Sequence, residues 1–257
     1  MKYIRNLTQL TKDDASIAGG KGANLGELMR TGFSVPEGFV VLAKAFELAS
    51  DGKAPAGVAE EIKTHFKKLS APLVAVRSSA TVEDGASAAW AGQFDTYLNT
   101  DEAHLIENVQ NCWSSSYSSR ATFYASEFSS QGNISMAVVV QRMVQSEISG
   151  VAFSVHPVTQ DRDRMIIEAS RGLGDKMVSG HVTPDSFVVD KKTLRVTNKE
   201  HAKEGKPVLS DEQLQELAGT VLRIEEHFGI PCDVEWAFEK GKFYITQSRP
   251  ITTLADL

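Results

Sequence analysis

The sequence predicts an α+β fold built from two lobes. Three observations support this prediction. The first half alternates amphipathic helices with short apolar strands, the second half holds five apolar segments at short intervals, and a helix and a hairpin end the chain. The change of pattern predicts a helix-rich first lobe at 1–130 and a sheet-rich second lobe at 131–257. A chain of 257 residues supplies ample material for a hydrophobic core.

The first half is expected to contain four helices and three extended segments. In the first helix Leu25, Leu28 and Met29 share one face, and Gly32 ends it. A later helix carries a regular apolar stripe that includes Ile62. The expected helices cover 22–30, 43–49, 56–69 and most of 101–128, and the extended segments cover 35–41, 72–79 and 92–99.

The second half is expected to be mainly antiparallel sheet. A helix over 211–228 has apolar residues at helical spacing and follows the five strand candidates. A hairpin over 230–250 then turns at Glu239–Lys242, where Gly241 supplies a positive φ. The five candidate strands cover 135–144, 149–155, 164–170, 185–190 and 193–197.

Composition and charge exclude several classes of protein. The net charge of −6 gives no general basic footprint for a nucleic acid. No apolar run is long enough to span a membrane, and residues 1–10 lack the apolar core of a signal peptide. Cys112 and Cys232 are too far apart in sequence for a close-spaced metal pair, so we expect a reduced, cytoplasmic setting.

The stretch SIAGGKGANLGEL, from Ser16 to Leu28, places glycines and Lys21 at the start of a helix. The Walker pattern needs a glycine at residue 15 and a Ser or Thr after Lys21, but residue 15 is Ala and Gly22 follows the lysine. The dinucleotide pattern needs a third glycine at residue 25, which is Leu. Three features still favour the binding of an anion. The glycines allow a ligand to approach the backbone closely, and the helix N-terminus and the lysine both attract negative charge. The alternative is a flexible turn with a solvent-exposed lysine.

A second stretch, AVRSSATVEDGASAAWAGQFDTYLN, begins at residue 75 with an apolar strand that ends in Arg77. An arginine beside two serines at a strand end suits bidentate phosphate binding. A loop of small residues follows, and then Gly92 and a strand that carries Thr96. The alternative is a surface arginine next to an ordinary hairpin.

The terminal hairpin places polar side chains on one surface. Asp233 and Glu235 alternate on its first strand, and Gln247 and Arg249 alternate on its second. Carboxylate and amide oxygens suit Mg²⁺ held jointly with phosphates, which an arginine can neutralise. The alternative is a solvated sheet face with one cross-strand ion pair.

Seven segments together resemble the nucleotide-binding domain of the pyruvate phosphate dikinase family, which includes phosphoenolpyruvate synthase and rifampin phosphotransferase. They occur in the family's order and cover nearly the whole chain, which makes the resemblance specific. The segments are GGKGANLGEL, VPEGFVV, VRSSATVEDGASAAWAGQFDTYLN, QRMV, SGVAFSVHPVT, GLGDKMVSGHVTPDSF and DVEWAFEKGKFYITQSRPIT.

The resemblance implies an ATP-grasp fold, in which two α+β lobes hold ATP. It implies that Lys21, Arg77 and Arg249 contact the phosphates and supply the catalytic positive charge. Gly92 and Thr96 would belong to the loop that covers the phosphates.

The resemblance also implies how the rest of the nucleotide and its metal are held. Gln141 and the backbone that follows, through Met143 and Val144, would meet the adenine. Glu235 and Gln247 would hold Mg²⁺. The implied cofactors are therefore ATP and Mg²⁺.

In this family ATP phosphorylates a histidine on a swivelling domain, and a third domain passes the phosphate to its acceptor. The chain contains no motif of the kind that carries that histidine. The resemblance therefore implies transfer of a diphosphoryl group to a phosphohistidine domain, with a substrate domain, in cis or in trans. Two alternatives stay open: the ATP-binding half of an antibiotic phosphotransferase, and a stand-alone ATP-binding regulatory protein.

Overall fold

The computed structural model describes residues 2–50, 52–81, 95–115, 135–174, 183–201 and 207–251. Its helices and two antiparallel sheets confirm the α+β class. The chain divides into two compact units, Met1–Met143 and Val144–Leu257. No helix in the described ranges is long and apolar enough to cross a membrane.

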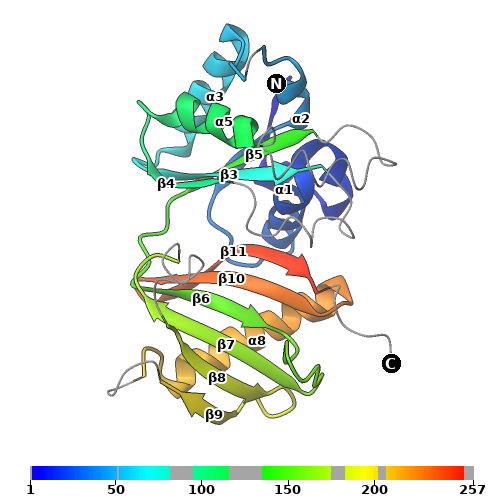
Figure 1. Ribbon diagram of the computed structural model, residues 1–257, viewed down its shortest axis with the longest axis vertical. Coiled ribbons are helices and arrows are strands. Elements are labelled where there is room, and N and C mark those ends of the chain that lie inside the picture. Colours follow the sequence, from blue (N-terminus) through cyan, green and yellow to red (C-terminus); the bar gives the residue numbers. More distant parts are fainter. Residues whose placement is uncertain are drawn as a thin grey trace. The chain divides into compact units, whose positions relative to one another are not determined.

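The first unit is a five-stranded sheet with helices on both faces (Figure 1). The strand order is β1-β2-β5-β3-β4, and every neighbouring pair is antiparallel. The strands are β1 Ile4–Asn6, β2 Gly38–Val41, β3 Val74–Ala80, β4 Thr96–Thr100 and β5 Met136–Arg142. The helices are α1 Ala15–Arg30, α2 Ala43–Glu47, α3 Ala56–Leu69 and α5 Leu105–Ser114, with short 3-10 turns at Leu7–Gln9 and Lys12–Asp14.

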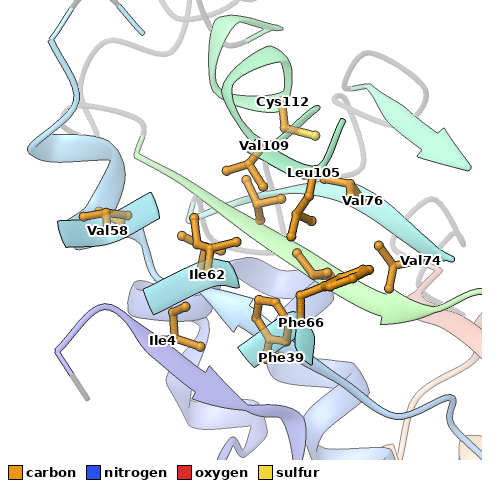
Figure 2. Close-up of a cluster of buried hydrophobic side chains, with 14 of the residues drawn as sticks. Ile4, Phe39, Val58, Ile62, Phe66, Val74, Val76, Leu105, Val109 and Cys112 are labelled. Atoms are coloured by element: carbon orange, nitrogen blue, oxygen red, sulfur yellow. The ribbon is translucent and has the colours of Figure 1, made fainter. Parts of the chain in front are cut away.

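The main core of the first unit lies between this sheet and helices α3 and α5. Figure 2 shows Ile62 and Phe66 of α3 and Val109 of α5 close to Val74 and Val76 of β3. Side chains alternate across a strand, so the intervening residues of β3 point to the opposite face. Helix α1 covers that opposite face.

The second unit is a six-stranded antiparallel sheet with the order β11-β10-β6-β7-β8-β9. Helix α8, Asp211–Phe228, packs on one face of it (Figure 1). The helix starts at a capping box formed by Ser210 and Gln213 and ends at Gly229 in the left-handed conformation. The strands are β6 Ile148–Phe153, β7 Arg164–Arg171, β8 Asp185–Asp190, β9 Val196–Glu200, β10 Cys232–Glu239 and β11 Lys242–Pro250.

The boundary between the two units falls after Met143, later in the sequence than the expected boundary after residue 130. Strand β5 pairs with β2 and β3 of the first sheet, so its residues belong to the first unit. The run of β5, like the first strands of the second unit, is mainly apolar. Composition therefore assigned it to the wrong neighbours, because strand pairing is a tertiary property.

Two expected elements also differ in extent. Helix α1 begins at Ala15, earlier than the expected start at 22, and its backbone breaks at Gly19. The expected helix over 101–128 is a helix at Leu105–Ser114, and the remainder from 116 on lies outside the described residues. The expected turn of the terminal hairpin is confirmed, with Gly241 at a φ of 77°.

Candidate functional site

Lys21 lies on α1, two residues after the break at Gly19. Its Nζ donates a hydrogen bond of 3.0 Å to the backbone oxygen of Ser78 on β3. The break therefore places a lysine over the sheet, and the lysine contacts the strand that carries Arg77. This contact sets Lys21 apart from the solvent-exposed lysine of the alternative interpretation.

Arg77 lies on β3 and is 7% exposed, so it is not the surface arginine of the alternative interpretation. It alternates with the core residue Val76 and therefore points to the face of the sheet that α1 covers. Thr96 of β4 is directly opposite Arg77 in the register and shares that face. Gly92 lies outside the described residues.

Gln141 lies near the end of β5 on this same α1-facing side, because it alternates with the core residue Val140. It is 2% exposed, and its amide donates to the backbone oxygen of Pro36 at 3.1 Å. The backbone N–H of Met143 donates to the Leu73 oxygen at 3.1 Å. These bonds fix the backbone where the first unit ends, and Val144 begins the second unit.

The first unit thus collects Lys21, Arg77, Thr96 and Gln141 on one side of its sheet. Two of them are cations, and one is a buried amide. The residues come from four different elements, and pairing of β3 with β4 and β5 brings them together. The two cations of this set can bind an anion, and the amide can form hydrogen bonds to the edge of a polar ring.

Glu235 and Gln247 face each other in the second unit. They are directly opposite on β10 and β11, so both side chains lie on one face. Trp236 and Phe243 pack together with a centroid distance of 5.6 Å on the other face, which α8 covers. A register shift follows Glu235, and such a bulge re-aims the side chains beside it. Two oxygen donors on the sheet face opposite α8 fit a magnesium ion that takes its other ligands from phosphates.

Asp233 and Arg249 form a second pair directly opposite each other on these strands. The Arg249 Nε donates to Asp233 Oδ2 at 2.8 Å, and its Nη2 lies 2.7 Å from the same oxygen. Burial raises the pKa of the Asp233 carboxyl, and the neighbouring guanidinium opposes that rise. The cross-strand ion pair of the alternative interpretation is therefore present, next to Glu235 and Gln247.

Sequence reasoning did not include Glu168 of β7 among the candidate residues. Val151 of β6 pairs with Glu235 on one side and with Glu168 on the other, so both carboxylates lie on the sheet face opposite α8. Burial raises the pKa of Glu168. The signal in the sequence is a single acidic residue inside the apolar run RMIIEAS. An acid within an otherwise apolar strand points away from the face that packs against a helix.

The described ranges contain no group of three or more His, Cys, Asp or Glu side chains placed to hold a metal ion. A cation held by Glu235 and Gln247 would take its remaining ligands from outside this pair, and Mg²⁺ usually takes them from water and phosphate oxygens.

Comparison with known proteins assigns the family. Residues 47–256 match the model of the pyruvate phosphate dikinase AMP/ATP-binding domain. The chain belongs to this family.

Similar proteins support this assignment along the whole chain. A probable phosphoenolpyruvate synthase of Methanothermobacter thermautotrophicus is 39% identical over 100% of this chain and 47% of its own length. A probable phosphoenolpyruvate synthase of Methanocaldococcus jannaschii is 38% identical over 99% of this chain and 27% of its own length. The phosphoenolpyruvate synthase of Pyrococcus furiosus is 35% identical over 99% of this chain and 44% of its own length. The chain thus spans less than half the length of these relatives.

Among solved structures, PH1788 from Pyrococcus horikoshii aligns with a TM-score of 0.45 and 13% identity, over 95% of each chain. The family assignment rests on the sequence matches and not on this alignment. Lys21 lies before the matched range of the family model but within the span that the relatives cover.

Proposed function

We propose that the chain binds Mg-ATP and transfers the terminal diphosphoryl group to a histidine on a separate domain or protein. A histidine nitrogen attacks the β-phosphorus, and the bridging oxygen leaves with the α-phosphate as AMP. The match to an AMP/ATP-binding domain over most of the chain carries this proposal. The names of the relatives extend it to phosphoenolpyruvate synthesis from pyruvate, which a further substrate domain completes.

In this proposal the chain acts by binding, orienting and neutralising charge. Lys21 and Arg77 of the first unit and Arg249 of the second hold the phosphates, and fixed cations stabilise the charge that develops during transfer. A guanidinium has five N–H donors, so the contact of Arg249 with Asp233 leaves capacity for a second acceptor. The attacking group comes from outside, so the mechanism needs no general base within the chain.

The remaining candidate residues bind and orient the nucleotide. Gln141 and the backbone through Met143 and Val144 hold the adenine, and Thr96 belongs with Gly92 to the segment that covers the phosphates. Glu235 and Gln247 hold Mg²⁺, which when bound adds positive charge at the phosphate oxygens.

The assignment of the site is tested with Arg77→Ala and Glu235→Ala in the full chain. We expect each to weaken Mg-ATP binding by about tenfold or more, because each removes a charged contact to the nucleotide or its metal. Arg164→Ala is the matched control. Arg164 forms an ion pair with Asp190 at 3.1 Å, outside the candidate residues, and its loss should leave ATP affinity unchanged. Circular dichroism verifies that all variants fold, and unaltered affinity in both site variants would refute the assignment.

The transfer itself is tested by mixing the chain with ATP and the remaining part of the Methanothermobacter relative, expressed separately. We expect AMP and an acid-labile phosphohistidine, and phosphoenolpyruvate on addition of pyruvate. Lys21→Ala should abolish AMP formation. Formation of ADP in place of AMP would contradict attack at the β-phosphorus.

A further inference from the structure

The break in α1 is bridged by an uncharged side chain, that of Ser79 on β3. Gly19 has φ 70° and ψ 162° inside an otherwise helical segment. A helix that stops and restarts leaves backbone carbonyl and N–H groups without their intrahelical partners. The Ser79 side chain of β3 enters this break, and its Oγ would lie only 2.2 Å from a Cβ placed on Gly19.

Ser79 bonds to the backbone on both sides of the break. Its hydroxyl donates to the oxygen of Ala18 at 2.8 Å and accepts from the N–H of Gly22 at 3.1 Å. Ser79 is 2% exposed, so solvent does not readily replace these bonds. One hydroxyl thus ties both parts of α1 to the strand.

Lys21 lies directly between these contacts. Its following residue, Gly22, is bonded to Ser79, and its own Nζ is bonded to the oxygen of Ser78. Arg77 precedes these two serines on the same strand. Three consecutive residues of β3 therefore determine where the two cations of the first unit stand relative to each other.

We infer that Ser79 is a positioning residue that holds Lys21 in register with Arg77. The inference rests on the proposed function, in which both cations contact phosphates of one ATP. Charges held in place before the ligand arrives stabilise it more than charges that must first be ordered. Loss of the hydroxyl leaves the Gly22 N–H and the Ala18 carbonyl without this partner, so the backbone around Lys21 relaxes.

The inference predicts a defect specific to phosphates. Ser79→Ala should weaken Mg-ATP binding by about tenfold and adenosine binding by less than about twofold. Ser154→Ala is the matched control, because Ser154 is fully buried and accepts the Cys232 N–H at 2.8 Å. This control should lower thermal stability but leave the ratio of the ATP and adenosine dissociation constants unchanged.

A double-mutant cycle with Lys21→Ala separates positioning from general destabilisation. If Ser79 acts through Lys21, Ser79→Ala has little further effect on ATP affinity once Lys21 is removed. Ser79→Cys keeps a weaker donor and acceptor at the site and serves if the alanine variant does not fold. It should show a smaller loss that is still specific to ATP.

The outcomes separate this inference from the proposed function. A wild-type chain that does not bind Mg-ATP would overturn both. If the wild-type chain binds Mg-ATP but the Ser79 variants weaken ATP and adenosine binding equally, the positioning role alone is overturned. It is also overturned if the effects of Ser79→Ala and Lys21→Ala on ATP affinity are fully additive. A phosphate-specific, non-additive loss supports it.

Discussion

Gly19→Ala tests the break in α1 directly. A Cβ on Gly19 would lie 2.2 Å from Ser79 Oγ, 2.3 Å from its backbone oxygen and 2.5 Å from its carbonyl carbon. The backbone conformation, φ 70° and ψ 162°, is also one that only glycine adopts readily. The strain and the weakening of both Ser79 hydrogen bonds together cost about 2–6 kcal/mol. For a unit of this size we expect a drop in Tm of about 6–18 °C.

Thermal unfolding followed by circular dichroism measures this effect. Gly219→Ala in the middle of α8 is the control, since its Cβ would lie 3.7 Å from Leu194 at ordinary contact distance. It should stabilise the protein by about 0.5–1 kcal/mol through helix propensity. Ser79→Ala should not rescue Gly19→Ala, because two of the three closest atoms are backbone. A Tm of Gly19→Ala within a degree of wild type, or full rescue by Ser79→Ala, would refute the reasoning.

Three further predictions follow from the titratable groups. Burial raises the pKa of Glu168, so the ionised carboxylate lowers the stability of the folded protein. Glu168→Gln should therefore raise Tm at about pH 7. The gain should vanish below about pH 4, where the carboxyl is protonated in both the folded and the unfolded protein. In the Asp233–Arg249 pair the side chains are 9% and 39% exposed, so Arg249→Met, which strands the buried carboxylate, should lower Tm more than Asp233→Asn. The deficit of Arg249→Met should shrink on acidification as the carboxyl becomes protonated, and a pH-independent deficit would argue against this cause. Burial raises the pKa of Cys112 to about 11 and of Cys232 to about 12. The lower thiolate fraction should slow reaction with a thiol reagent in the native protein, relative to the unfolded protein, by about 100-fold for Cys112 and about 1000-fold for Cys232.

Elements with strong local signals were predicted well from the sequence. The helices over 56–69 and 211–228 have the expected bounds. Both helices carry an apolar stripe along their length, which is a local signal. The second also has Ser210 as its N-cap and Gly229 at its C-terminal end, and such caps are signals within one turn of a helix end. The hairpin turn at Gly241 has the same local origin.

Elements whose limits depend on distant residues were predicted less well. The early start of α1 escaped detection because the glycines at 19 and 20 weaken a helix, whereas Ser79, far along the chain, bridges the break. Strand β5 was assigned to the second half because apolar composition does not specify a partner. Contacts between residues distant in sequence decided both outcomes, through the Ser79 hydrogen bonds for α1 and through strand pairing for β5.

The sequence by itself determined the family, the residue types of the candidate site and the alternation that puts Glu235 and Gln247 on one face. Such information is local, since it depends on residue identity and on the period of two in a strand. Only the tertiary structure decided that Lys21 contacts the strand of Arg77, and that Ser79 joins the two. These contacts link residues far apart along the chain, and they form because buried polar groups must find hydrogen-bonding partners wherever packing brings strands and helices together.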